Sequence, residues 1–281
     1  MKATHARQCG QFSDTNVCAA AGACLLDATA GACHLLAMTI PDLRTFEADG
    51  TVMDGAAFED YRRPASLIDS DHPDIVAFAR DAVGGAREPV EQAVRIYFAV
   101  RDGLRYDPYG TPMRREAYAA SACLNARHGY CVNKAGLMAA ACRAVGIPAR
   151  LGYADVRNHM TTKRLSEWMG SDTFYFHGYT DVWLNGRWLK ATPAFNKELT
   201  DKFRLKALDW DGQSDSIYHP FDLDGRRHME YLAYRGVYAD IPFGTIRAAF
   251  RHYYPKMYRA DGDSTLHGDF AAEGAAEAAG R

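Results

Sequence analysis

The sequence predicts an α+β protein with an antiparallel sheet, because helical and strand patterns occupy different parts of the chain. Apolar residues recur at helical spacing before about residue 146, and aromatic-rich strand patterns follow at about 149–156 and 174–191. The later strand pattern contains Asn185-Gly186, the strongest short signal for a hairpin. Helices followed by a hairpin favour antiparallel pairing over alternating βαβ units.

The helical region divides into several elements. The first helix is expected to run from Pro73 to about Val83, since proline is tolerated in a first turn and two glycines follow. A second helix is expected at about 89–100, with its apolar residues on one side. Shorter helices are expected at about 116–126 and 165–169.

One cysteine stands directly before the most apolar of the predicted helices. Residues 132–145 contain no proline, Gly146 and Pro148 end the run, and Gly129 permits a sharp turn before Cys131. A thiol at a helix N-terminus meets free N–H groups and the positive end of the helix dipole. This position favours a thiolate nucleophile of lowered pKa, and the alternative is an inert core cysteine.

The two-residue Asn-Gly turn fixes the register of the predicted hairpin. Asp181 then faces Lys190, as expected for a surface ion pair between strands. His177 shares a face with Thr192 and lies diagonal to it, about 7–8 Å away by Cα. Thr192 is therefore placed to touch the imidazole, unless pairing changes at Pro193. The alternative is that His177 is only a packing residue.

Composition excludes several classes of function. The chain has 281 residues, of which 48% are hydrophobic, and a net charge of −2, which gives no reason to expect binding to nucleic acid or to a membrane. The seven cysteines are an odd number without the spacing of a disulfide scaffold, so a reducing cytoplasm is expected. Neither zinc spacing nor a calcium loop is present, and no cofactor is expected.

The chain is expected to contain a single folded domain between two less ordered ends. Residues 1–37 form an Ala- and Cys-rich extension without clear periodicity, and we expect it to be poorly ordered. The domain is expected at 38–259. Residues 260–281 contain almost no large apolar side chain, which predicts a disordered tail.

Two blocks of the sequence resemble the bacterial transglutaminase-like superfamily, a group related to papain. The first block is Gly129-Tyr130-Cys131, followed by the helix and Gly146-Ile147-Pro148-Ala149-Arg150. The second is His177-Gly178-Tyr179-Thr180-Asp181-Val182, followed by the turn and Trp188. The resemblance implies a papain/transglutaminase-like core in which the nucleophile helix packs on an antiparallel sheet.

The resemblance also implies a cysteine-dependent enzyme. Cys131 would attack an amide of a peptide or protein substrate, His177 would take the thiol proton, and a thioester would then be hydrolysed or transferred to an amine. Proteolysis of peptide bonds is a further possibility. The alternative is a catalytically inactive peptide-binding or scaffold module that retains the fold.

The sequence departs from the family at the third catalytic position. The acid expected four residues after the tryptophan is replaced by Thr192, which can accept a hydrogen bond from the imidazole of His177 but carries no charge. The orienting role is therefore open among Thr192, Asp155, Asn158 and Asn196.

An oxyanion formed at the reacting carbonyl would lie at the start of the helix. The backbone N–H of Cys131 is the first expected donor. A second donor is expected from the preceding loop, with Tyr130, His128 and Asn125 as candidates.

Overall fold

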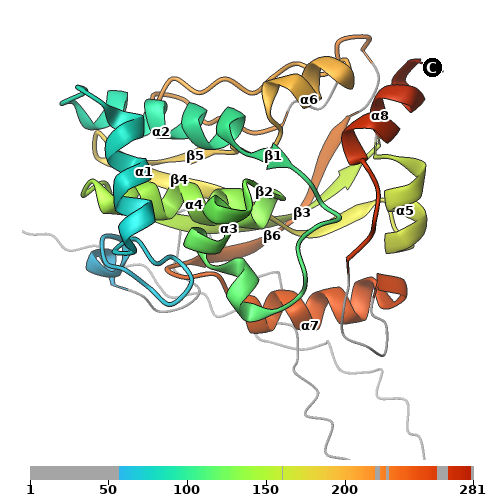
Figure 1. Ribbon diagram of the computed structural model, residues 1–281, viewed down its shortest axis with the longest axis horizontal. Helices are drawn as coiled ribbons and strands as arrows, with labels where there is room; N and C mark the ends of the chain where they lie inside the picture. Colours follow the sequence, from blue (N-terminus) through green and yellow to red (C-terminus); the bar gives the residue numbers. More distant parts are fainter. Residues whose placement is uncertain (1–56, 160, 219–221, 226–227, 258–264, 280–281) are drawn as a thin grey trace, which may run out of the picture. The chain divides into compact units, whose positions relative to one another are not determined.

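The described part of the chain contains a four-stranded antiparallel sheet with the strand order β5-β4-β3-β6 (Figure 1). Its strands are β3 (Ala149–Asn158), β4 (Thr173–Leu184), β5 (Arg187–Ala191) and β6 (Met229–Tyr238). Helices precede most of these strands in the sequence, so the predicted α+β class is confirmed.

This computed structural model describes residues 57–159, 161–218, 222–225, 228–257 and 265–279. The extension expected at 1–37 lies outside the described residues. All of the described residues belong to one unit, 40–281. Among them, no helix is both long enough and apolar enough to cross a bilayer.

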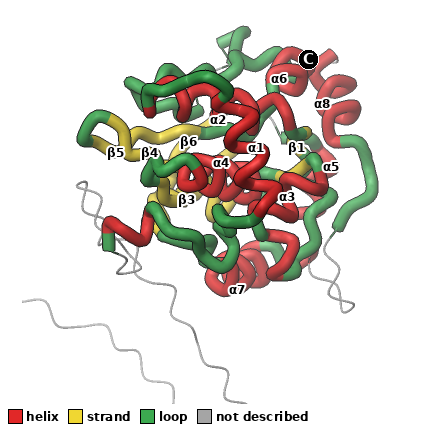
Figure 2. Tube along the Cα trace, turned by 60° about the vertical axis from the view of Figure 1, so that its left-hand side comes forward, coloured by secondary structure: helices red, strands yellow, loops and turns green. Residues whose placement is uncertain are grey.

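The central helix α4 (Cys131–Ala144) packs on β3 and β4. Three helices surround it: α1 (Pro73–Val83), α2 (Pro89–Gly103) and α3 (Ala120–Ala126) (Figure 2). Every residue from Cys131 to Arg143 is buried, as expected of a helix that is covered on all sides. These four helices confirm the corresponding sequence predictions.

Shorter elements connect these parts. A two-residue strand, β1 (Arg105–Tyr106), pairs in parallel with β2 (His128–Gly129) just before α4. The remaining elements are the 3-10 helices η1 (Phe58–Tyr61), η2 (Arg115–Tyr118) and η3 (Pro255–Met257), and the α-helices α5 (Lys163–Met169), α6 (Lys197–Lys202), α7 (Phe243–Tyr253) and α8 (Phe270–Ala279).

The predicted hairpin register is confirmed, but the predicted surface ion pair is wrong. Asp181 does lie opposite Lys190. However, Asp181 is only 2% exposed, and its carboxylate accepts from Nε of Arg150 at 3.1 Å. Arg150 lies directly across from Asp181 on β3, while Lys190 pairs with Asp215. The hairpin alone could not show that a third strand buries this carboxylate.

The prediction of a disordered tail at 260–281 is wrong for residues 270–279. Residues 270–279 form α8, which lies beside α6 (Figures 1 and 2). Phe270 is buried, and its ring lies 5.7 Å from the rings of Tyr106 and Tyr109. Glu273 accepts hydrogen bonds from the Tyr109 hydroxyl and from Arg164. The segment is ordered because Phe270 packs into the core and because its many alanines favour a helix, although its composition indicated disorder.

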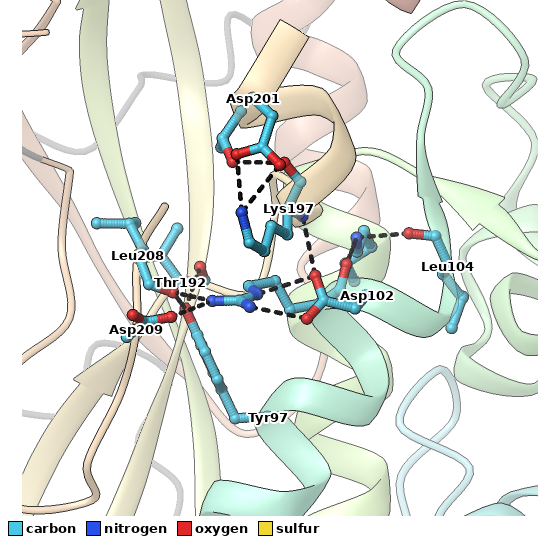
Figure 3. A network of polar contacts seen from close by, with 11 residues as sticks. Tyr97, Asp102, Leu104, Thr192, Lys197, Asp201, Leu208 and Asp209 are labelled. Atoms are coloured by element: carbon cyan, nitrogen blue, oxygen red, sulfur yellow. Dashed lines mark hydrogen bonds and ion pairs between the residues drawn. The ribbon is translucent and has the colours of Figure 1, made fainter. Parts of the chain in front are cut away.

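A partly buried polar network joins the end of α2 to the segment that follows β5 (Figure 3). Arg101 binds the Asp102 and Asp209 carboxylates and the Leu208 carbonyl. The Tyr97 hydroxyl lies 2.6 Å from the Leu208 carbonyl oxygen and 3.3 Å from that of Thr192. The network therefore holds the backbone at Thr192 against α2.

Lys134 connects the same helix end to the core of α4. It is fully buried, and its ammonium donates to the carbonyls of Arg101 and Leu104, both at 2.8 Å. Burial lowers its pKa from 10.5 to about 7. The two carbonyls close α2, where a positive charge is favourable.

Replacement of Lys134 by methionine keeps the length of the side chain but leaves both carbonyls without this donor. We expect Lys134→Met to lower the free energy of unfolding by about 1–3 kcal/mol. As pH falls from 10.5 toward about 7, the unfolded chain binds the proton before the folded one, so the stabilising contribution of Lys134 decreases. Urea unfolding at the two ends of this range should show the difference between the two proteins shrinking at the lower pH. The exposed Lys206→Met is the control, and a difference independent of pH would contradict the assignment.

Candidate active site

Cys131 is the first residue of α4, as the sequence predicted. The preceding Tyr130 is extended, so the chain turns into the helix at the cysteine itself. The Cys131 side chain is 4% exposed. The backbone N–H groups of Gly178, Val132 and Cys131 act to lower the pKa of the thiol. Two of these groups belong to the helix start, and the third belongs to β4.

Gly178 allows β4 to reach the first turn of α4. A Cβ at this position would lie 3.1 Å from the Val132 Cα and 3.5 Å from the Cys131 carbonyl oxygen. Two residues further along β4, the Thr180 hydroxyl donates to the Ala135 carbonyl at 2.9 Å. The strand that carries His177 is therefore fixed against the helix that carries Cys131.

His177 lines the same pocket as Cys131. The imidazole is buried, and its Nε2 has no hydrogen-bond partner. The ring centroid lies 5.2 Å from that of Tyr218. Burial lowers the pKa of His177 to about 4, so the imidazole is neutral at pH 7.

The pKa of Cys131 differs from the sequence expectation. Burial raises the pKa of this thiol from 9.0 to about 11, although the three backbone N–H groups act in the opposite direction. The favourable helix start is therefore outweighed by the loss of solvent. At pH 7 the structure favours a neutral thiol and a neutral imidazole, whereas the sequence predicted a thiolate of lowered pKa.

The expected hydrogen bond between Thr192 and His177 is not formed. Both the Thr192 hydroxyl oxygen and His177 Nε2 are buried without a partner. Pairing between β4 and β5 ends at Thr180 and Ala191, one step before Thr192. The contact of the Thr192 carbonyl with Tyr97 then directs the backbone toward α2 (Figure 3).

Two of the alternative orienting residues are committed elsewhere. The Asp155 carboxylate accepts from Arg235 at 2.6 Å and from the Phe176 backbone N–H at 3.3 Å. It therefore supports β4 just before His177. The Asn196 side-chain oxygen accepts from the Tyr106 N–H at 3.1 Å.

Asn158 lines a second, smaller cavity together with His177, Tyr218 and Phe270. In the sheet, His177 pairs with Ala154, four residues before Asn158 on β3. Asn158 is 5% exposed, and the Tyr218 hydroxyl in this cavity has no partner. Sequence reasoning missed Tyr218, because the segment around it has neither helical nor strand periodicity.

The candidate oxyanion donors lie in different places. Tyr130 lines the pocket, and its hydroxyl is 2.8 Å from that of Tyr118. The structure does not bring Asn125 to the pocket, since its exposed side chain donates to Asp74. His128 is half-buried and does not line the pocket either.

The pocket beside Cys131 has about 560 Å³ of empty volume, including the part open to solvent. Aromatic and methionine side chains dominate its lining, among them Tyr106, Met113, Trp168, Phe174, Tyr175 and Tyr254. No cluster of His, Cys, Asp or Glu side chains suited to a metal occurs among the residues that the structure describes.

Comparisons with solved structures find distant similarity. A proposed cysteine protease from Cytophaga hutchinsonii is 20% identical, with a TM-score of 0.38, over 52% of this chain and 46% of that chain. A proposed protease from Parabacteroides distasonis is 16% identical, with a TM-score of 0.33, over 45% and 24%. The arylamine N-acetyltransferase from Mycobacterium abscessus is 17% identical, with a TM-score of 0.35, over 47% and 46%. The matched region is less than half of each of these proteins. No curated protein matches the sequence.

The family comparison is more direct. The model of the transglutaminase-like superfamily matches residues 76–193. This segment contains α4 with Cys131, β4 with His177, and the end of the hairpin. Residues 76–193 of this chain are therefore similar to the transglutaminase-like superfamily.

Proposed function

We propose that the protein is a thiol-dependent acyltransferase or hydrolase that acts on amide bonds of a peptide or protein through a thioester. One observation carries this proposal. Cys131, at the start of a helix, lines the same pocket as His177, and the residue after His177, Gly178, packs closely against the Val132 Cα of that helix. A buried structural cysteine has no need of this arrangement.

The first step is attack on the substrate, and it starts from a neutral Cys131 thiol and a neutral His177 imidazole. The Cys131 sulfur bonds to the substrate carbonyl carbon while its proton moves to His177. The carbonyl oxygen becomes an oxyanion, which the backbone N–H of Cys131 stabilises at the helix start. Because the site is buried, this donor is worth more than it would be in water.

The second step releases the leaving group. The oxyanion reforms the carbonyl, the bond to the leaving amine breaks, and the amine takes the proton from His177. Water attacking the thioester then gives hydrolysis, and a second amine gives transfer. The choice between these outcomes depends on which nucleophile reaches the thioester.

An acyl-enzyme on Cys131 is the direct test. After incubation with an activated acyl ester and an acid quench, intact-protein mass spectrometry should show one added acyl group, and peptide mapping should place it on Cys131. Cys142→Ser removes a fully buried thiol of the same helix and should still be acylated, whereas Cys131→Ser should not. A folded protein that forms no adduct would favour the inactive scaffold.

The protonation state of the site is a second test. With the pKa of Cys131 near 11 and that of His177 near 4, the ultraviolet thiolate band should be absent at pH 7 and should grow as pH rises toward 11. The difference spectrum between the protein and Cys131→Ser isolates this band from the tyrosines. A full thiolate band at pH 7 would contradict this assignment and would indicate an ion pair between a Cys131 thiolate and a His177 imidazolium.

The orienting role is proposed to belong to Asn158. Asn158→Ala should lower kcat by about tenfold with little change in KM, because it removes a polar amide from the cavity that Asn158 shares with His177. Asn158→Asp adds a negative charge that favours imidazolium, so the acid limb of kcat/KM, near pH 4, should move to higher pH.

Thr192→Val is the matched control for Asn158, because the Thr192 hydroxyl has no partner to lose. We expect this variant to retain the kcat of the unaltered protein. Loss of kcat in Thr192→Val, with normal activity in Asn158→Ala, would return the orienting role to Thr192.

A further inference from the structure

The pocket beside Cys131 is uncharged. Among the described residues that line it, none is Asp, Glu, Lys or Arg, and the groups able to titrate are Cys131, His177 and tyrosines. Its half-buried rim includes Pro108, Trp168 and Tyr175. A substrate group that enters this pocket therefore leaves water for a predominantly apolar surface.

Several hydroxyls in the pocket are already engaged with the protein. Tyr118 donates to the Met113 sulfur and is paired with Tyr130 at 2.8 Å. The Tyr254 hydroxyl donates to the Thr173 carbonyl at 2.8 Å and accepts from the Tyr175 N–H at 2.6 Å. A charged ligand would have to break such bonds or remain unpaired, which is costly in a buried site.

The walls of the pocket limit the shape of a bound group. The empty volume of about 560 Å³ includes the part open to solvent, so the walls are the more direct guide to what fits. Rings at the pocket are held rigidly, with Tyr175 stacked on Tyr253 at 3.6 Å between centroids and Trp168 packed edge-on against Tyr109 at 6.1 Å. Such walls favour a flat or branched apolar group.

We propose that this pocket binds the acyl side of the substrate, and that it selects an uncharged, flat or branched apolar acyl group. The proposal rests on the proposed thioester chemistry at Cys131 and adds the substrate class. The sulfur attacks the acyl carbon, the ester or amide bond to the leaving group breaks, and the leaving group departs with the proton that His177 took from the thiol. Water or an amine then takes the acyl group and restores the thiol.

A series of nitrophenyl esters tests the selection. From acetyl to pentanoyl, kcat/KM should rise by about fourfold for each buried methylene, and the phenylacetyl ester should react faster than the acetyl ester. The glutaryl monoester has the chain length of pentanoyl but ends in a carboxylate, and its kcat/KM should be lower by about 100-fold or more. Equal rates for all the esters, or a preference for the charged one, would overturn the proposal.

Pocket variants localise the effect. Trp168→Ala should lower kcat/KM for the phenylacetyl ester by about tenfold relative to the acetyl ester. Trp183→Ala is the matched control, since Trp183 packs against Phe58 and Trp188 and does not line the pocket. Thr111→Asp, a change at the half-buried rim, should reduce the same preference without removing a large side chain.

Binding to Cys131→Ser separates the two proposals. Neutral amides of pentanoic and phenylacetic acid should quench tryptophan fluorescence at lower concentration than acetamide, without any chemistry. This preference, together with ester turnover that does not require Cys131, would refute the thioester mechanism and leave the pocket assignment intact. Turnover that requires Cys131 but shows no preference among acyl groups would refute the pocket assignment alone. Stronger binding of the trimethylammonium amide than of its neutral tert-butyl counterpart would show a cation site formed by the aromatic rings, and would also overturn the assignment.

Discussion

The close approach of β4 to the first turn of α4 is the constraint on which the candidate site depends. It exists because position 178 has no side chain, since a Cβ would lie 3.1 Å from the Val132 Cα. The backbones of the helix and the strand therefore pack directly against each other at this point. The Thr180 hydroxyl bond to the Ala135 carbonyl continues the same contact toward the middle of α4.

The same burial that forms the site sets its protonation state. The pKa of Cys142 is raised to about 12 by burial, with only a coulombic contribution from Arg143 opposing it. Cys131 is equally enclosed, but three backbone N–H groups partly offset the loss of solvent, and its pKa is raised only to about 11. One of them, the N–H of Cys131, is also the proposed donor to a developing oxyanion. A donor arrangement too weak to ionise the resting thiol can still stabilise charge that forms during a reaction.

The C-terminal segment completes the surroundings of His177. Phe270 from α8 lines the small cavity that His177 shares with Asn158 and Tyr218. The helix is tied to α5 by the ion pair between Arg164 and Glu273, and α5 in turn contributes Trp168 to the larger pocket. Both cavities around the imidazole are thus bounded by elements that the C-terminal segment holds in place.

The sequence by itself determined the elements of the core. Proline and glycine positions bounded α1 and α4, and the Asn-Gly turn set the hairpin register, because these signals act within a few residues of the chain. It also indicated Cys131 and His177, since both stand in blocks of local sequence. The segment at 270–279 was misjudged because its order depends on one distant aromatic contact, that of Phe270 with Tyr106 and Tyr109.

Only the tertiary structure decided what surrounds the two candidate catalytic residues. The partner of Asp181 comes from β3, the contact that directs Thr192 comes from α2, and the cavity beside His177 is completed by Tyr218 and Phe270. Each of these contacts joins residues that are far apart in the sequence, so no local pattern encodes it. The protonation state of the Cys131 thiol also depends on tertiary packing, because burial raises its pKa. The helix start before it, in contrast, can be recognised from the local sequence.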